Sequence, residues 1–204
     1  MENKYKAIIF DMGGVLLRSV DSAPRDAIAR RFGTTREELE KFVFRGSTSV
    51  KSEKGEVSDI FHWETVLKHF CRSEEDPRKI YNEYFSGDAI DQELLEFAES
   101  LKPDLKIGLL SNAWVDSRKR LGSLFHFIEI FDVSIFSAEV KERKPEPEIY
   151  RIMLKKLEAK PDECIFIDDF PENIEGAKKL GISTILFENT QDTIRNINSM
   201  LGRG

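Results

Sequence analysis

The stretch YKAIIFDMGGVLL, residues 5–17, contains a short apolar run, then one carboxylate, and soon after it a pair of glycines. A run as short as Ala7–Phe10, made mostly of β-branched and aromatic residues, is typical of a buried parallel strand. Asp11 then falls at the carboxyl end of this strand, where ligands bind in open α/β sheets. Gly13 and Gly14 allow the backbone to bend sharply and to approach a ligand closely. The alternative is an ordinary turn after a strand, because Asp and Gly are also common in turns.

The composition of the chain fits one compact domain with a modest insert, or two small lobes. Of the 204 residues 40% are apolar, including 15 Phe, which is enough for a sizeable core. The net charge of -6 argues against a nucleic-acid partner, since such proteins usually carry a basic patch. No apolar run approaches the roughly 20 residues that span a bilayer, and MENKYKAII at the N-terminus lacks the apolar region of a signal peptide. The two cysteines, Cys71 and Cys164, lie far apart and lack metal-ligand spacing, so we expect a cytoplasmic protein. We also expect no membrane partner, and a monomer or a dimer.

An inserted group of helices is expected directly after this first stretch. Apolar residues recur at helical spacing in about four segments between residues 18 and 87. Two of these segments have clear start signals, the capping-box pattern Thr35-x-x-Glu38 and the pair Asp76-Pro77. Residues 45–56 are rich in Gly, Ser and Lys, which favours a loop that serves as a hinge or sets specificity. We therefore expect a helical cap over 18–87, inserted into a core formed by residues 1–17 and 88–204.

Strands and helices alternate through the rest of the chain. Buried strands are expected at 106–110, 131–136, 164–167 and 183–187, separated by amphipathic helices. This alternation is typical of an α/β fold with a parallel sheet.

Polar residues stand at three of the expected strand ends. Asp11 follows the first strand, Ser111-Asn112 the second, and Asp168-Asp169 the fourth. Because the carboxyl ends of parallel strands lie along one edge of a sheet, these residues are expected to share one crevice. Lys144 is expected beside them, since it precedes a helix whose start is fixed by the nearby prolines.

Together these side chains suit phosphoryl transfer. Three carboxylates in one crevice repel one another, and a hard cation such as Mg²⁺ relieves this by binding carboxylates, waters and phosphate oxygens. A Ser hydroxyl and backbone N–H groups suit phosphate oxygens, and Lys144 would neutralise both the phosphate and the attacking carboxylate. A carboxylate that attacks phosphorus forms an aspartyl-phosphate.

In these motifs the chain resembles the haloacid dehalogenase (HAD) superfamily over its whole length. The four segments that carry the resemblance are Asp11-Met12-Gly13-Gly14-Val15, Leu109-Leu110-Ser111-Asn112, Lys144-Pro145, and Ile165-Phe166-Ile167-Asp168-Asp169 followed by Asn173. The insert resembles the small helical cap of the subclass that includes many sugar-phosphate and nucleotide phosphatases. The resemblance implies a Rossmann-like core and a Mg²⁺-dependent phosphatase that acts on a small phosphate monoester.

The resemblance also implies roles for individual residues. Asp11 would be the nucleophile and a metal ligand, and Gly13 would offer a backbone carbonyl to the metal. Ser111 and Asn112 would hold phosphate while Lys144 steadies the charges. Of the paired acids, Asp169 would bind the metal directly, and Asp168 would act through water or orient it. Asn173 would fasten a loop.

One position departs from the family pattern. Family phosphatases usually carry a second Asp two places after the nucleophile, which protonates the leaving oxygen, and here that position is Gly13. Losing a general acid/base typically costs about 10²- to 10⁴-fold in rate. A catalytically weak or non-catalytic HAD-fold binding protein is therefore the alternative function. Dehalogenation at carbon, with the same nucleophile and no metal, is a third.

Several further residues are candidates for contact with the substrate or the cap. In the expected cap they are Arg45, Lys51, His62 and Trp63, although the last two also fit core and surface roles. Trp114 either shapes the mouth of the pocket or packs, and Arg18 is placed to face the cap.

Overall fold

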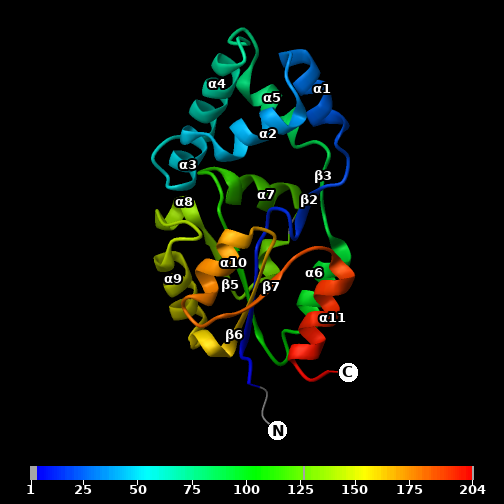
Figure 1. Ribbon diagram of the computed structural model, residues 1–204, viewed down its shortest axis with the longest axis vertical. Coiled ribbons are helices and arrows are strands. Elements are labelled where there is room, and N and C mark those ends of the chain that lie inside the picture. The colour runs from blue at the N-terminus through cyan, green and yellow to red at the C-terminus, as the bar shows by residue number, and fades with distance from the viewer. Residues whose placement is uncertain (1–3, 126, 204) are drawn as a thin grey trace.

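The computed structural model describes residues 4–125 and 127–203 and contains a five-stranded parallel sheet (Figure 1). The strand order is β5-β4-β1-β6-β7, so the first strand in the sequence lies at the centre of the sheet. The strands are β1 (Ala7–Phe10), β4 (Lys106–Ser111), β5 (Val133–Phe136), β6 (Cys164–Asp168) and β7 (Ser183–Leu186). All five lie where the apolar runs predict them. Strand β5 begins two residues later than expected because a 3₁₀ turn, Ile128–Ile130, precedes it.

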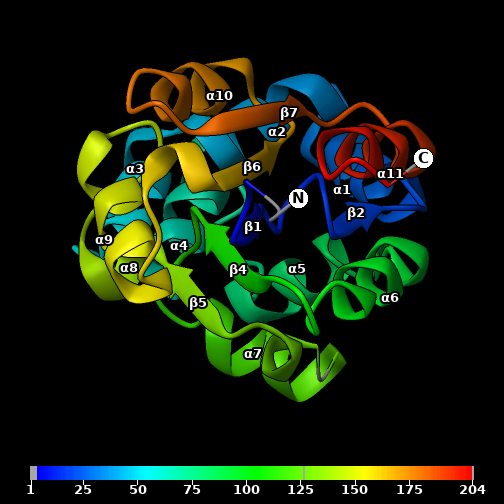
Figure 2. The same cartoon turned by 90° about the horizontal axis from the view of Figure 1, so that it is seen from below.

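Helices cover both faces of the sheet (Figure 2). One face packs against α6 (Gln92–Ser100), α7 (Ser117–Phe125) and α11 (Thr190–Met200), and the other against α8 (Ser137–Val140), α9 (Pro147–Leu157) and α10 (Pro171–Lys178). Alternate residues of β1 supply the two cores, Ile8 and Phe10 one and Ala7 and Ile9 the other. The fold is thus the expected α/β, Rossmann-like sheet. In the part of the chain that is described, no helix has the length and apolar character needed to cross a bilayer.

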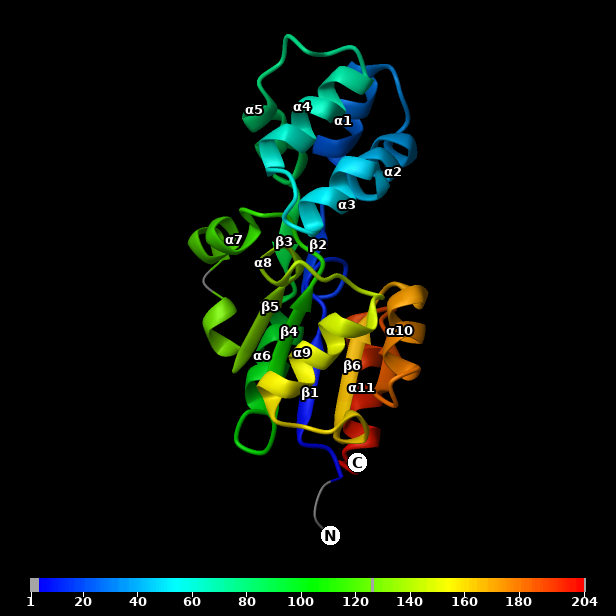
Figure 3. The same ribbon diagram turned by 90° about the vertical axis from the view of Figure 1, so that its left-hand side faces the viewer.

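A second group of helices lies beyond the carboxyl edge of the sheet (Figure 3). This helical lobe consists of α1 (Ala23–Phe32), α2 (Arg36–Arg45), α3 (Ser47–Glu53), α4 (Asp59–His69) and α5 (Pro77–Tyr84). Two short antiparallel strands, β2 (Leu17–Ser19) and β3 (Asp88–Ile90), connect it to the sheet. The lobe has its own apolar core around Trp63, whose side chain is fully buried.

Local signals in the sequence explain several ends of the lobe helices. The Thr35 hydroxyl accepts from the N–H of Glu38 at 3.2 Å, and the Glu38 carboxylate accepts from the N–H of Thr35 at 3.4 Å, so the capping box is present. Gly33 ends α1 in the left-handed region, with φ 71°.

The expected loop at 45–56 is the exception, because most of it is helix α3. Two serines of this helix are fully buried and bonded, Ser49 to the carbonyl of Phe44 and Ser52 to the carboxylate of Asp59. These buried hydrogen bonds hold a polar segment in helical form.

Candidate active site

The polar residues at the strand ends meet at the centre of the sheet. Strands β4, β1 and β6 are neighbours, with Phe10 level with Leu109 on one side and Ile167 on the other. Asp11, Ser111 and Asp168 therefore come together at one edge. Each of these three side chains is buried.

Lys144 lies between two of the carboxylates. Its ammonium is 2.7 Å from Oδ1 of Asp11 and 2.6 Å from Oδ2 of Asp168, and the residue is only 1% exposed. Burial alone would lower the pKa of Lys144, but the charges of Asp11 and Asp168 and their hydrogen bonds outweigh it and raise that pKa. The lysine is thus held charged against the predicted nucleophile.

Asp168 is held by a network of donors. Its Oδ1 accepts from the N–H of Phe170 at 2.8 Å, and Nδ2 of Asn173 lies 3.0 and 3.1 Å from its two oxygens. The hydroxyl of Tyr150 donates to the carbonyl of Asn173 at 2.8 Å. With Lys144 included, both carboxylate oxygens of Asp168 are used within the protein, which suits a residue that orients its neighbours.

Asn112 fixes the backbone of Lys144 rather than pointing free into the site. Its Nδ2 donates to the carbonyl of Lys144 at 2.9 Å, and its Oδ1 accepts from the N–H of Lys144 at 2.8 Å. Both ends of the side-chain amide are therefore occupied. Ser111, at 1% exposure, lines the same cavity as Asp11.

Asp169 differs from Asp168 in having an unused oxygen. Its Oδ1 is buried and has no hydrogen-bond partner among the residues that the structure describes. A Cβ at Gly14 would lie 2.2 Å from Oδ2 of Asp169, so the carboxylate rests against bare backbone that only glycine, at φ 83°, provides. Burial, followed by the charge of Asp168, raises the pKa of Asp169 to about 6.

The three acids fit a hard divalent cation. One oxygen from each of Asp11, Asp168 and Asp169 lies within 4.8 Å of the others. Burial raises the pKa of Asp11, the ion pair with Lys144 offsets part of this, and the charges of Asp168 and Asp169 add to it. One ammonium does not balance the three carboxylates, two of which are buried, and Oδ1 of Asp169 has no partner in the described chain. Carboxylate oxygens are the ligands that Mg²⁺ prefers.

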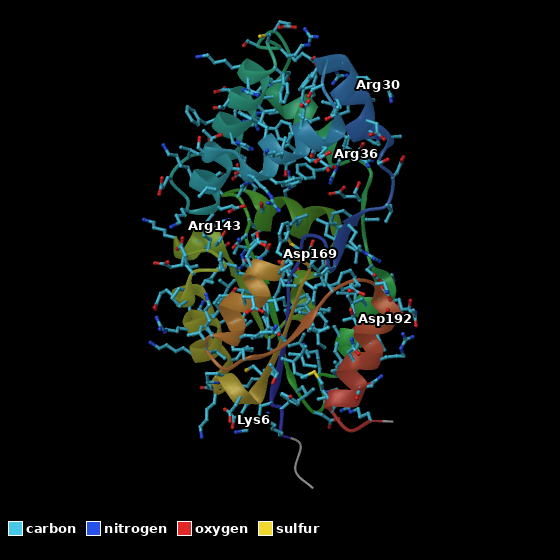
Figure 4. The ribbon with its side chains drawn as sticks, in the orientation of Figure 1. Lys6, Arg30, Arg36, Arg143, Asp169 and Asp192 are labelled. Atoms are coloured by element: carbon cyan, nitrogen blue, oxygen red, sulfur yellow. The ribbon has the colours of Figure 1, made fainter. Side chains whose placement is uncertain are left out.

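A large cleft opens above these residues, between the sheet and the helical lobe. Its volume is about 1410 Å³, and its floor includes Asp11, Gly13, Ser111 and Lys144. Figure 4 shows Asp169 where the sheet meets the lobe. No described atom lies within 4 Å of where a Cβ of Gly13 would stand, so position 13 opens into free space.

The substrate-contact candidates of the lobe separate into two groups. Arg45 lines the cleft and lies over the ring of Phe170, 5.4 Å from its centroid. His62 and Trp63 are fully buried inside the lobe, and Lys51 is exposed outside the cleft lining. Arg18 lines the cleft too, and pairs with Asp91.

Some cleft residues carry no signal in the sequence. Glu53 and Arg143 join lobe and core, with Oε2 of Glu53 2.6 Å from Nε of Arg143. Arg120 lies over the ring of Tyr81 at 3.8 Å. The only hint in the sequence is that Arg143 precedes Lys144.

Trp114 packs in the lobe core and also lines the cleft. It is 6% exposed and belongs to the apolar core of the lobe, although it follows strand β4. Its Nε1 donates to the hydroxyl of Ser49 at 3.1 Å.

The parallel sheet, the acids at its central strand ends and the helical lobe above them define a hydrolase of the HAD class with a Rossmann-like core. The chain belongs to the haloacid dehalogenase-like hydrolase family, whose model matches residues 5–181. Its relatives include proteins named as a phosphorylated carbohydrates phosphatase and a D-ribitol-5-phosphate phosphatase.

Two curated relatives illustrate the range of similarity. The D-ribitol-5-phosphate phosphatase of Bacteroides thetaiotaomicron is 27% identical over 96% of this chain and 98% of that protein. The mouse bifunctional epoxide hydrolase 2 is 33% identical over 61% of this chain. The alignments cover between 23% and 39% of the length of the mouse, rat and pig bifunctional enzymes, so their whole-protein activities do not transfer.

Solved structures share the whole architecture. A HAD family enzyme of Bacteroides thetaiotaomicron superimposes with a TM-score of 0.78 at 24% identity, over 95% of this chain and 98% of that one. A second structure of that enzyme, an aspartate-to-alanine variant, is a complex with magnesium and inorganic phosphate. Its TM-score is 0.72 at 25% identity, over 90% of this chain and 94% of that one.

Proposed function

We propose that this chain is a Mg²⁺-dependent phosphatase that hydrolyses a small phosphate monoester through an aspartyl-phosphate formed on Asp11. One observation carries the proposal. The buried carboxylate of Asp11 is held by the Lys144 ammonium at 2.7 Å, and it shares its cluster with Asp169, whose Oδ1 has no partner in the described chain. A nucleophile, a fixed positive charge and a vacant ligand atom therefore stand together.

The metal would be held by Asp11, by Asp169 and by the backbone carbonyl of Gly13. When bound, Mg²⁺ supplies positive charge that screens the phosphate oxygens from the carboxylates. Asp168 would contribute indirectly, because its oxygens are already engaged by Lys144, Phe170 and Asn173.

The chain's own residues would carry the chemistry. Asp11 attacks phosphorus, the bond from phosphorus to the leaving oxygen breaks, and that oxygen takes its electron pair and a proton. Water then attacks phosphorus, releases inorganic phosphate and restores the Asp11 carboxylate. Lys144 favours the ionised form of Asp11 before the attack and holds its side chain in place through a short contact.

The phosphate would bind between Ser111 and Lys144. The Ser111 hydroxyl and the backbone N–H of Asn112 would donate to its oxygens, whereas the Asn112 side chain keeps the Lys144 segment in place. The helical lobe over residues 18–87 would act as a cap that closes on the rest of the ester. The phosphatases among the relatives support a small phosphorylated substrate.

A panel of phosphate esters, assayed with Mg²⁺ and with EDTA, tests the proposal. We expect metal-dependent release of phosphate that is abolished in Asp11→Asn, because the neutral amide is a poor nucleophile. Asp104→Asn, at an exposed ion pair far from the cleft, is the matched control and should retain the rate. Phosphate release by Asp11→Asn near the wild-type rate would contradict the role of Asp11. Halide release without metal would favour dehalogenation.

A further inference from the structure

The site lacks a proton donor where one is needed. An alkoxide is a poor leaving group, so hydrolysis of an alkyl phosphate needs an acid beside the leaving oxygen. Position 13, two residues after Asp11, points into the open cleft and has no side chain. The proton must therefore come from elsewhere on the cleft wall.

Seven acidic residues line the cleft: Asp11, Glu37, Glu40, Glu53, Asp88, Asp169 and Glu172. Asp11 and Asp169 belong to the carboxylate cluster. Asp88 and Glu40 pair with Arg25 inside the lobe, at 2.7 and 3.2 Å. Glu37 and Glu172 are exposed to solvent. Glu53 alone of the seven is buried outside the cluster, at 8% exposure.

Glu53 is also positioned firmly over the core. It is the last residue of α3, and its Oε2 accepts from Nε of Arg143 at 2.6 Å. The next residue, Lys54, pairs with Glu146 of the core at 2.8 Å. Gly55 then packs on the core so closely that a Cβ there would lie 2.6 Å from the carbonyl of Ala138.

One oxygen of Glu53 remains available to the cleft. No hydrogen bond reaches its Oε1 from any described residue, while Oε2 is committed to Arg143. Arg143 directly precedes Lys144, whose ammonium contacts Asp11. Figure 4 shows Arg143 near the level of Asp169, below the lobe. The ion pair thus fixes the Glu53 carboxyl on the cleft wall, against the residue that precedes Lys144 in the chain.

We propose that Glu53 of the lobe performs the proton transfers for which position 13 has no side chain, an inference that rests on the phosphatase function proposed above. In the first step Asp11 forms a bond to phosphorus and the bond to the leaving oxygen breaks. That oxygen keeps the electron pair and takes the proton of the Glu53 carboxyl. In the second step the Glu53 carboxylate takes a proton from the attacking water, whose oxygen bonds to phosphorus and displaces Asp11.

The surroundings of Glu53 suit this double role. Burial raises the pKa of Glu53, and the opposing charges of Arg143 and Lys144 do not cancel the rise. A group that both gives and takes a proton works best with a pKa moved towards the working pH.

Glu53→Gln tests the proposal with two esters of similar shape. Benzyl phosphate leaves as an alkoxide that needs the proton, and para-nitrophenyl phosphate leaves as a stable aryloxide. With saturating Mg²⁺, we expect kcat/KM for benzyl phosphate to fall about 10²- to 10⁴-fold. The value of kcat/KM for the aryl ester should change less than about tenfold. This quantity reports only the steps through aspartyl-phosphate formation, and in those steps the aryloxide leaves without a proton. A burst of nitrophenol should appear, since water attack is slowed.

Two further variants complete the test. Glu56→Gln, an exposed residue in the same segment, should leave both rates unchanged. Adding Gly13→Asp to Glu53→Gln should restore the benzyl rate, because position 13 has room for the new side chain. Urea unfolding checks that Glu53→Gln still folds. If it does not, Glu53→Asp, which withdraws the carboxyl by one methylene, should give the same selective loss.

Equal losses for the two esters would overturn the proposal and leave Glu53 as a structural clamp. An unchanged benzyl rate in a folded Glu53→Gln would overturn it as well. If wild type releases phosphate from neither ester nor from any other with Mg²⁺, the proposed function itself fails. Activity of the wild type on both esters therefore distinguishes a failure of the Glu53 proposal from a failure of the proposed phosphatase function.

Discussion

Replacing Lys144 with methionine removes a buried positive charge while keeping a side chain of similar length. The ammonium contacts Asp11 at 2.7 Å and Asp168 at 2.6 Å, and the three side chains are 1%, 7% and 0% exposed. Water therefore does not replace the lost partner. Breaking a buried ion pair from one side costs about 3–5 kcal/mol, and we expect Lys144→Met to lower the free energy of unfolding by that amount near about pH 8.

The loss should depend on pH. Burial already raises the pKa of Asp11, and losing Lys144 raises it further. An acid whose pKa is higher in the folded than in the unfolded state binds more protons when folded, so its destabilising effect grows as pH rises and fades as pH falls. The deficit of Lys144→Met relative to wild type should therefore shrink near about pH 5.

Urea unfolding in EDTA at both pH values measures the effect. Lys178→Met is the control, because its pair with Glu175 is 54% and 60% exposed and such pairs contribute at most about 1 kcal/mol. A loss below about 1 kcal/mol for Lys144→Met at the higher pH, or an equal loss at both, would refute the reasoning.

Three further predictions concern the acids and the lobe. Asp169→Ala should raise the Mg²⁺ concentration for half-maximal activity more than Asp168→Ala does. Asp168→Ala should lower the free energy of unfolding more, because it leaves buried donors unpaired. Metal titration measures the first effect and urea unfolding the second, and equal metal effects would contradict the assignment. Burial lowers the pKa of His62 to about 4, so the folded state stays neutral while the unfolded state takes up a proton below about pH 6.5. The free energy of unfolding should fall by roughly 2–4 kcal/mol between about pH 6.5 and about pH 4, and His62→Gln should flatten this dependence. Thr35→Ala should cost about 1 kcal/mol in urea unfolding through loss of the cap on α2, and no change would mean that the cap is solvated instead.

The strands and their polar ends could be predicted because each signal is local. Ala7–Phe10 is apolar and short, and Asp11 follows it directly, so strand and site residue come from one stretch of sequence. The same holds for Ser111 after β4 and for Asp168-Asp169 at the end of β6. Parallel pairing then brings these ends together without any knowledge of the loops.

Contacts between distant segments could not be predicted in this way. Helix α3 looks like a loop in sequence, since its stability comes from buried serine hydroxyls rather than from an apolar stripe. Glu53 and Arg143 are 90 residues apart, and nothing in a polar segment indicates burial. The two hydrogen bonds of Asn112 to the Lys144 backbone depend on loop conformation, which residue type alone does not fix.

Trp114 links the sheet to the helical lobe. Its backbone follows β4 by three residues, yet its indole stands among lobe rings, 6.3 Å from the centroids of both Phe44 and Trp63. Any motion that separates lobe and sheet must expose this indole to water or drag Ser111 with it. Trp63 is fully buried inside the lobe, so a change of tryptophan emission on separation of lobe and sheet would come from Trp114.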